Sequence, residues 1–375
     1  MRVGVPTEIK PDEYRVAVTP AGVRELTKLG HDVVIQHGAG EGSAVADTDY
    51  EAQGARILPD ADAVFGEAEL VLKVKEPQPA EVARLRPEHT LFTYLHLAPA
   101  PDLTKGLCDS GAICIAYETV EDERGRLPLL APMSEVAGKI ATQAGAFMLE
   151  KPLGGRGVLL GGVPGVAAAT VVIIGGGVVG MNAAFIALGM EADVFVLDKD
   201  IDTLRGLDIA LNGRGSTVYS STVAVEELLP RADLVIGAVL VHGARAPFVV
   251  TREHLGLMKR HAVLVDVSID QGGCFETSRP TTHSDPTYEV DEVTHYCVTN
   301  MPGAVPITST YALTNATLPY VLAIAEHGAR GAIAADPGLR PGVNVAGGQV
   351  THPAVAEGVG LPYTPVEEIL GPQAV

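Results

Sequence analysis

The chain is strongly acidic and long enough for two domains. It has 375 residues, of which 47% are hydrophobic and 19% charged, with a formal net charge of −19 and a pI near 4.9. This composition indicates a folded globular protein, and the acidic excess argues against binding to nucleic acid or to anionic membranes. We therefore expect small-molecule ligands, with neither nucleic acid nor a membrane as a partner.

The start of the chain and its cysteines favour a cytoplasmic protein. The opening residues, Met1–Pro6, contain no hydrophobic stretch of the kind found in signal peptides. The cysteines show neither C-x-x-C nor zinc-site spacing, which suits a reducing compartment and buried, unreactive thiols. They are Cys108, Cys114, Cys274 and Cys297.

Residues 1–128 alternate between strand and helix patterns, which is typical of an α/β domain. A helix is expected to begin after Thr19 as N-cap, with Pro20 at its first position, and to end at Gly30. No glycine fingerprint follows the first strand, so we predict the first part of a substrate domain here and not a dinucleotide-binding domain. The expected strands are Arg2–Val5, Asp32–Gln36, Leu70–Lys75, Thr90–Leu97 and Ala112–Glu118.

The second region carries a glycine-rich loop in the context that dinucleotide binding requires. A β-branched run, Val171–Ile174, leads directly into Gly175–Gly180, which has the pattern G-x-G-x-x-G. Gly175 would form the tight turn, Gly177 would allow the backbone to approach a pyrophosphate, and Gly180 would let the next helix pack on the strand. A simple glycine-rich turn is the alternative, and the surrounding strands and helix disfavour it.

The segment after the glycine loop completes a βαβ unit. Gly189 is expected just beyond the helix, and the strand Ala192–Leu197 ends at Asp198. An acid at this position accepts hydrogen bonds from ribose hydroxyls. It also repels the 2′-phosphate of NADP by about 4 kcal/mol at a separation of about 4 Å, a repulsion that the neighbouring Lys199 partly offsets, so NAD is favoured over NADP. A membrane span over the uncharged residues 157–190 is disfavoured, because a proline and several glycines interrupt it.

Further strand and helix patterns follow at the spacing of successive βα units, so we predict a doubly wound Rossmann domain over residues 129–304. A long helix over Ser134–Leu149 would form the crossover between domains. A helical return over Thr308–His327 and a Gly- and Pro-rich tail would pack on the first domain, so that residues 305–375 complete a discontinuous α/β substrate domain. Further strands are expected at Thr217, Leu234 and Ala262, and helices over Asp200–Leu211, Val223–Leu229 and Arg252–Met258.

Four polar residues at strand ends or in loops are candidates for chemistry. Arg15 suits a substrate carboxylate, although a surface salt bridge is the alternative on local sequence. Lys75 and His96 come at the carboxyl ends of predicted strands, where α/β sites form, and an imidazole can act as acid or base near neutral pH. Asp270 lies just beyond a strand of the second region, whereas Asp266 lies inside that strand and is interpreted as structural.

Motifs spread over nearly the whole chain are shared with one known family. They are PTEIKPDEYRVAVTPAGV, LVLKVKEP, LFTYLHLA, LLAPMSEVAG, GGVPGV, the glycine loop, LVIGAVL, VLVDVSIDQGGCFETSRPTT and YCVTNMPGAVPITSTYALTNATLPY. With these motifs the sequence resembles the alanine dehydrogenases, which are similar in fold to the NAD(H)-binding subunits of proton-translocating transhydrogenases. The pairing of LHL with DVSIDQGG is far more specific than the glycine pattern alone.

The resemblance implies roles for the residues at matching positions. Arg15 and Lys75 match the ligands of the substrate carboxylate, and His96 and Asp270 match the catalytic pair. Contacts to NAD are implied at Ser134, Gly175, Gly177, Val178, Val179, Gly180, Asp198, Ser220, Val239, Leu240, Val267, Ile269, Arg279, Asn300 and Met301.

Two positions depart from the pattern of some relatives. Thr203 stands where some relatives have a basic residue near the adenosine ribose, which alters that end of the cofactor site. Ala323 replaces a carboxylate that accompanies His327 in a metal site of some relatives, so no metal is expected.

The function implied by the resemblance is NAD-dependent, reversible oxidative deamination of L-alanine to pyruvate and ammonium by a cytoplasmic homohexamer. One alternative is the NAD(H)-binding subunit of a proton-translocating transhydrogenase, which would have a membrane partner. Another is a non-catalytic NAD-sensing module, which would need only the second domain. The joint presence of Arg15, Lys75, His96 and Asp270 favours the enzyme. The preference among alanine, serine and glycine and the direction of the reaction in the cell are left open.

Overall fold

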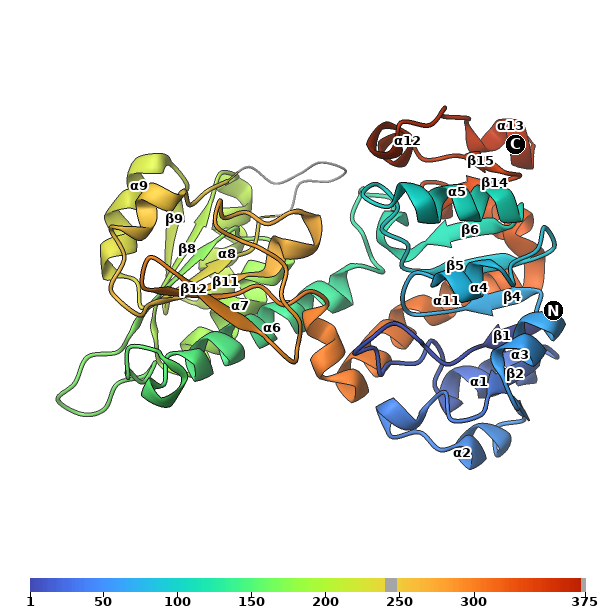
Figure 1. The fold of residues 1–375 in the computed structure, drawn as a ribbon, viewed down its shortest axis with the longest axis horizontal. Helices are drawn as coiled ribbons and strands as arrows, with labels where there is room; N and C mark the ends of the chain where they lie inside the picture. Colours follow the sequence, from blue (N-terminus) through green and yellow to red (C-terminus); the bar gives the residue numbers. More distant parts are fainter. Residues whose placement is uncertain (240–247, 372–375) are drawn as a thin grey trace. The chain divides into compact units, whose positions relative to one another are not determined.

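The computed structural model describes residues 1–239 and 248–371, which divide into two units (Figure 1). The first unit consists of Met1–Met133 together with Val305–Val375, and the second of Ser134–Ala304. Each unit is built on one sheet whose strands are mostly parallel. The two-domain α/β fold predicted from the sequence is confirmed.

The sheet of the first unit has the strand order β15-β14-β6-β5-β4-β1-β2-β3. Strands β1 to β6 pair in parallel, whereas β14 pairs antiparallel with both β6 and β15. The order reverses between β1 and β4, and open α/β sheets bind ligands at the carboxyl ends of the strands at such a switch point. The strands are β1 (Arg2–Val5), β2 (Asp32–Gln36), β3 (Arg56–Leu58), β4 (Leu70–Leu72), β5 (Thr90–Thr93), β6 (Ile113–Ala116), β14 (Val343–Ala346) and β15 (Gln349–Val350).

Helices cover both faces of this sheet, with α4 and α5 in front of it and α11 behind it in Figure 1. Helix α1 begins as predicted, because the Thr19 hydroxyl accepts a hydrogen bond from the N–H of Gly22 and Pro20 is the first helical residue. The helices are α1 (Pro20–Lys28), α2 (Asp47–Glu51), α3 (Ala61–Glu67), α4 (Pro79–Val82), α5 (Pro101–Ser110), α11 (Pro306–Ala335), α12 (Pro353–Val359) and α13 (Val366–Leu370), with short 3₁₀ helices η1 (Glu41–Ser43), η2 (Tyr117–Thr119) and η7 (Pro337–Leu339).

The sheet of the second unit has the order β12-β13-β11-β10-β7-β8-β9, and only the β12–β13 pair is antiparallel among the described residues. Numbered along the chain, its parallel strands follow the order 3-2-1-4-5-6 of dinucleotide-binding folds, with the reversal between β7 and β10. The strands are β7 (Thr170–Ile174), β8 (Asp193–Asp198), β9 (Ser216–Tyr219), β10 (Leu234–Gly237), β11 (Val263–Asp266), β12 (Thr287–Val290) and β13 (Val293–Tyr296).

The helices of the second unit connect these strands. Helix α8 begins after its N-cap, Asp200, whose carboxylate accepts hydrogen bonds from the N–H groups of Asp202 and Thr203. Helix α6 contains the boundary between the two units. The helices are α6 (Ala131–Met148), α7 (Val178–Gly189), α8 (Ile201–Leu211), α9 (Thr222–Leu228) and α10 (Arg252–Leu255), with 3₁₀ helices η3 (Lys151–Leu153), η4 (Leu229–Arg231), η5 (Val267–Gln271) and η6 (Met301–Ala304).

Two strands of the first unit are shorter than the predicted Leu70–Lys75 and Thr90–Leu97. Beyond the end of β4, the N–H of Val74 donates to the carboxylate of Glu8 at 2.6 Å. Beyond the end of β5, two successive backbone N–H groups donate in the same way to the carboxylate of Glu118. The strands end early because a side chain, and not a neighbouring strand, accepts these hydrogen bonds.

Three helices differ from the sequence-based expectation. Gly189, expected just beyond α7, is its last residue, and the left-handed conformation is adopted by Glu191 with φ of 65°. Helix α10 stops at Leu255, short of the predicted Met258. Helix α11 continues past His327, and a non-helical residue, Gly328, interrupts it before the alanine-rich sequence resumes a helical course.

The uncharged stretch 157–190 does not form one long helix. It contains the completely buried strand β7 and the helix α7. Over residues 1–239 and 248–371, the structure contains no helix with the length and hydrophobicity needed to cross a membrane.

An ion-pair cluster at the start of β10 gives a test of stability. The carboxylate of Asp233 accepts hydrogen bonds from the N–H of Thr170 at 3.0 Å and from Lys259 Nζ at 2.9 Å, and it lies 2.9 Å from Arg156 Nε. We expect Asp233→Asn to lower the free energy of unfolding by about 2 kcal/mol, because hydrogen bonds to a buried charge are lost. Thermal melts followed by circular dichroism measure this. Asp193→Asn, in a half-exposed ion pair, is the control with an expected change below about 0.5 kcal/mol; equal losses would contradict the prediction.

Candidate substrate site of the first unit and candidate cofactor site of the second

Three of the predicted site residues lie beyond the carboxyl ends of β1, β4 and β5. Arg15 is in the loop between β1 and α1, Lys75 follows β4, and His96 follows β5. Strands β1 and β4 flank the switch point of the first sheet, and β5 pairs with β4. The topology therefore brings these three residues to one edge of one sheet.

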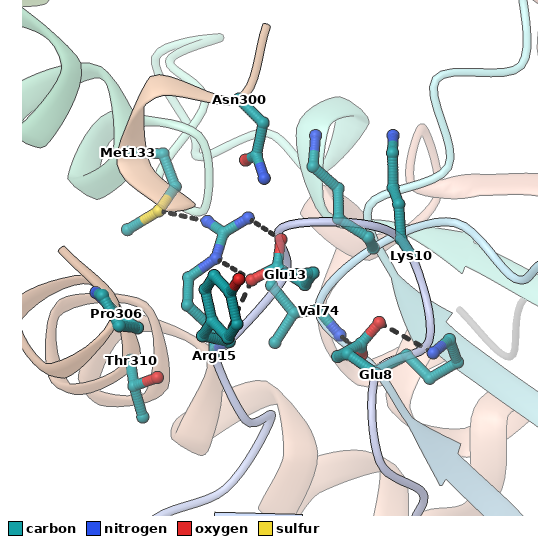
Figure 2. A network of polar contacts seen from close by, with 12 residues as sticks. Glu8, Lys10, Glu13, Arg15, Val74, Met133, Asn300, Pro306 and Thr310 are labelled. Atoms are coloured by element: carbon teal, nitrogen blue, oxygen red, sulfur yellow. Dashed lines mark hydrogen bonds and ion pairs between the residues drawn. The ribbon is translucent and has the colours of Figure 1, made fainter. Parts of the chain in front are cut away.

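Arg15 is in a salt bridge, but a buried one, which excludes the surface pairing considered from local sequence. Its Nε and Nη2 donate to the two carboxylate oxygens of Glu13 at 2.7 and 2.5 Å, and the two side chains are 1% and 0% exposed. Its Nη1 lies 3.1 Å from Met133 Sδ, so that the guanidinium group sits between Glu13 and Met133 (Figure 2). Burial opposes the charge, but the hydrogen bonds to Glu13 outweigh it and raise the pKa of Arg15.

A second buried cation, Lys73, stabilises the same edge. Its Nζ lies 2.8 Å from a carboxylate oxygen of Glu8 and 2.8 Å from one of Glu81. Burial alone would lower the pKa of Lys73, but the two carboxylates raise it, and burial raises the pKa of Glu8. Glu8 also accepts the N–H of Val74, as Figure 2 shows. The cluster thus joins the β1–α1 loop, the end of β4 and helix α4.

Lys75 is held by its backbone between β4 and β5. Its carbonyl oxygen accepts a hydrogen bond from the hydroxyl of Thr93 at 3.0 Å, and the preceding carbonyl, of Val74, accepts the N–H of Tyr94 at 3.2 Å. The residue is 6% exposed. A buried ammonium group at this edge can bind a carboxylate, which is the role predicted for Lys75.

His96 has a backbone conformation that is uncommon for residues other than glycine. Its φ is 49°, and its N–H donates to Glu118 Oε1 at 2.6 Å, while the N–H of Leu95 donates to the same oxygen at 3.1 Å. The imidazole stacks on the ring of Tyr94, with ring centroids 5.9 Å apart. Backbone strain that its surroundings maintain is a frequent property of functional positions.

The surroundings of His96 favour a neutral imidazole. Burial, followed by the positive charges of Lys75, Lys10 and Arg15, lowers its pKa to about 3. At neutral pH the side chain therefore has a lone pair that can accept a proton. A carboxylate bound beside these cations would offset their repulsion and raise the pKa.

The glycine loop of the second unit has the geometry that dinucleotide binding needs. Gly175 has φ of 106°, and a Cβ there would lie 2.4 Å from the carbonyl oxygen of Ala238. A Cβ at Gly180 would lie 1.8 Å from the carbonyl oxygen of Gly175, so α7 can pack on β7 only with glycine here. At Gly177 a Cβ would meet no atom of the described residues within 4 Å. The start of α7 is thus accessible to a pyrophosphate, and the residues present fit NAD.

Asp198 ends β8 beside this loop. Its Oδ2 accepts the N–H of Gly176 at 2.7 Å, and its Oδ1 accepts the N–H of Asp200 at 2.8 Å. Its carbonyl oxygen accepts the N–H of Ser220 at 2.8 Å, which brings two predicted cofactor residues together. Each carboxylate oxygen has a second lone pair that can accept a ribose hydroxyl.

Asp270 is exposed in η5, immediately after β11. Its Oδ2 is the acceptor for the N–H of Asn300, at 3.4 Å, so these two predicted residues are neighbours. Asp266 is completely buried and accepts the N–H of Cys274 at 2.9 Å and the hydroxyl of Ser278 at 2.6 Å. Asp266 therefore fixes the loop that carries Asp270, in agreement with its structural interpretation.

The remaining predicted cofactor residues belong to the second unit. The guanidinium carbon of Arg279 lies 4.0 Å from the ring centroid of Tyr288, and the Val239 carbonyl oxygen accepts the hydroxyl of Ser268 at 2.8 Å. Leu240 lies outside the described residues. The others are Ser134 in α6, Val178 and Val179 in the first turn of α7, Val267 and Ile269 in η5, and Met301 in η6.

The sequence predicts a catalytic pair and no bound metal. His96 and Asp270 belong to different units, so their pairing stays a prediction. Among the described residues, the structure contains no cluster of three or more His, Cys, Asp or Glu side chains that could hold a metal ion.

The acidic residues that hold these side chains were not among the predicted site residues. The pairing of Glu13 with Arg15 was predictable, because Glu13 stands two positions before Arg15 and residues at that spacing in an extended segment point the same way. The contact of Glu118 with the residues around His96 was also predictable, since Glu118 follows the strand next to that of His96. The pairing of Glu81 was not predictable from sequence, because its partner Lys73 lies in a different element and a charged side chain is usually exposed.

Sequence models of one family cover most of the chain. The N-terminal domain model of the alanine dehydrogenase/PNT family matches residues 4–137, and the C-terminal domain model of the same family matches residues 141–353.

Individual proteins agree with this match. An alanine dehydrogenase of Halomonas elongata is 59% identical, over 99% of this chain and 100% of the relative. The solved structure of an L-alanine dehydrogenase is 49% identical with a TM-score of 0.92, covering 96% of this chain and 99% of the other. A transhydrogenase from Sinorhizobium meliloti is 25% identical with a TM-score of 0.80, covering 94% of this chain and 100% of the other.

The environment of His96 predicts an unusual titration. In the free protein its imidazole should stay neutral from pH 8 down to about pH 4, since its folded pKa lies below the usual value of 6.5. The folded state consequently loses stability as the pH falls from about 6.5 toward 3, where the unfolded state binds a proton that the folded state does not. NMR titration of the imidazole C–H resonances, assigned with His96→Asn, measures this, and saturating propionate should raise the pKa. A pKa near 6.5 in the free protein would contradict the prediction.

Proposed function

Because the chain belongs to the alanine dehydrogenase/PNT family, we propose that it is an NAD-dependent L-alanine dehydrogenase. It would catalyse the reversible oxidative deamination of L-alanine to pyruvate and ammonium. The observation that carries the proposal is the edge of the first sheet, which brings the buried Arg15 and Lys75 together with His96, a residue with a positive φ and a lowered pKa. An NAD(H)-binding subunit of a transhydrogenase or an NAD-sensing module would not need these three side chains, and the dehydrogenase structure is also the more similar one.

The substrate carboxylate would be bound by the two cations. The planar guanidinium group of Arg15 can donate two parallel hydrogen bonds to a carboxylate, and the Lys75 ammonium adds a positive charge nearby. With its carboxylate fixed, the substrate has one orientation of its Cα–H bond, and such orientation contributes several kcal/mol to lowering the barrier. NAD, when bound, accepts the hydride from this carbon.

The proton transfers would be carried by His96 and Asp270. The substrate reacts with its amino group deprotonated, so that loss of hydride from Cα gives an iminium, and neutral His96 would take a proton from the water that adds to it. The resulting carbinolamine loses ammonia as His96 returns the proton to the nitrogen and Asp270 accepts the hydroxyl proton. Tyr94 stacks on the His96 ring and keeps its orientation.

The cofactor would bind to the second unit. The accessible start of α7 would bind the pyrophosphate, and Asp198 the adenosine ribose. The role of Ser134, Asn300 and the other predicted contacts comes from the family resemblance.

The cellular context follows from the resemblance as well. We infer a homohexamer in the cytoplasm, a compartment consistent with the four unpaired thiols. Light scattering after size-exclusion chromatography measures the number of subunits.

The activity itself is testable directly. We expect L-alanine to drive NADH formation at alkaline pH, with glycine and serine as comparison substrates. His96→Asn and Asp270→Asn should each lower kcat at least 100-fold while NADH still binds, because each removes a proton-transfer group. The double variant should lose no more of its kcat than the less active of the two single variants. Absence of alanine-dependent NADH formation in the wild type would refute the proposed function, whereas full activity of either variant would refute only its assigned role.

Cofactor preference follows from Asp198. The wild-type enzyme should use NAD much better than NADP, because the carboxylate repels the 2′-phosphate, and Asp198→Ala combined with Thr203→Arg should gain NADP activity. The ratio of kcat/KM values for the two cofactors measures this. Asp208→Ala, on the same helix as Thr203, is a control that should leave the ratio unchanged. Equal use of both cofactors by the wild type would show that Asp198 has another role.

A further inference from the structure

We propose that Glu13 is a positioning residue that fixes the guanidinium group of Arg15 in the orientation in which it binds the substrate carboxylate. This inference rests on the proposed function, in which Arg15 is a substrate ligand. Glu13 has no assigned role in the sequence motifs or in the proposed chemistry.

The geometry is a local network of hydrogen bonds within one loop. Glu13 Oε1 accepts Arg15 Nε at 2.7 Å and also the backbone N–H of Arg15 at 3.1 Å, while Oε2 accepts Nη2 at 2.5 Å. Three hydrogen bonds thus connect residues that are two positions apart, and they restrain both the backbone and the long side chain of Arg15. Two parallel bonds from a guanidinium to a carboxylate determine the plane of the guanidinium as well as its position.

The pair also determines which part of Arg15 meets the substrate. Glu13 occupies the side formed by Nε and Nη2, as Figure 2 shows. A substrate carboxylate that binds in the same bidentate manner is directed to the end formed by Nη1 and Nη2. Met133, whose sulfur lies 3.1 Å from Nη1, is next to that end.

Burial makes the pair necessary. The side chains of Arg15 and Glu13 are 1% and 0% exposed, and an unpaired charge at such a depth costs several kcal/mol. Glu13 therefore keeps Arg15 charged in the absence of substrate, and the raised pKa of Arg15 agrees with this.

A different role for Glu13 would be that of a competitor, which the substrate displaces from Arg15. The additional bond to the backbone N–H of Arg15 and the complete burial of the carboxylate argue for a fixed side chain. The two roles predict opposite effects on KM, because removing a competitor lowers the KM for substrate whereas removing a positioning residue raises it.

The experiment compares steady-state kinetics of the wild type with Glu13→Gln, which is isosteric but has one acceptor and lacks the charge. We expect KM for alanine and for pyruvate to rise about tenfold, and the Kd of NADH to stay within twofold, since only the carboxylate ligand is affected. Glu67→Gln, in a partly exposed ion pair with Arg56 of the same unit, is the control and should leave all constants unchanged.

A second variant covers the case in which Glu13→Gln does not fold. Glu13→Asp keeps the buried charge but is shorter by one methylene, so it cannot reach both Nε and Nη2, and an intermediate rise of KM, about threefold, is expected. In a double-mutant cycle, Glu13→Gln should have no further effect on KM in an Arg15→Gln background, because Glu13 acts through Arg15.

Each outcome decides the inference. A lower KM for alanine in Glu13→Gln, an unchanged KM, or effects that multiply in the double variant would overturn the positioning role of Glu13 while leaving the function intact. Unchanged KM values in both Arg15→Gln and Glu13→Gln would instead refute Arg15 as a substrate ligand and the inference with it. Wild-type protein without alanine-dependent activity would refute the proposed function first.

Discussion

The first unit depends on carboxylates that accept backbone hydrogen bonds where its strands end. Glu8 binds the N–H of Val74 beyond β4, and Glu118 binds two successive N–H groups beyond β5, including that of His96. Both carboxylates lie at places where a neighbouring strand would otherwise continue the ladder. As a result, the chain turns away from the sheet just where Lys75 and His96 occur, and the buried N–H groups remain satisfied.

The two units have the same parallel strand order but use its carboxyl edge differently. In the second unit the loop after the first strand is short and built of glycines, so that backbone N–H groups of α7 are accessible. In the first unit the corresponding loop, residues 6–19, carries charged side chains that are paired in the interior. The same topology therefore provides a backbone site for phosphate in one unit and a side-chain site for a carboxylate in the other.

Sequence patterns predicted the central strands of both sheets, but they predicted neither the charged network nor the strands β3, β12, β13, β14 and β15. Uninterrupted β-branched runs identified β7 because a strand buried on both faces is continuously apolar. The predicted ends of β4 and β5 were wrong. The observed ends are determined by Glu8 and Glu118, and each of these residues is distant in sequence from the N–H groups whose hydrogen bonds it accepts. For the site, Arg15 and His96 could be predicted from their positions and motifs. Burial of Arg15 could not, since it depends on Glu13 and on Met133 of α6.

Neutralisation of Arg15 by Glu13 has a consequence for anion selectivity. An uncompensated buried arginine would attract any small anion, inorganic phosphate and chloride included, because Coulombic attraction does not depend on the shape of the anion. A pair with no net charge removes most of this unspecific attraction and retains the directional hydrogen-bond donors, which favour planar carboxylates. Inorganic anions at cellular concentrations should therefore compete only weakly with an amino acid for Arg15.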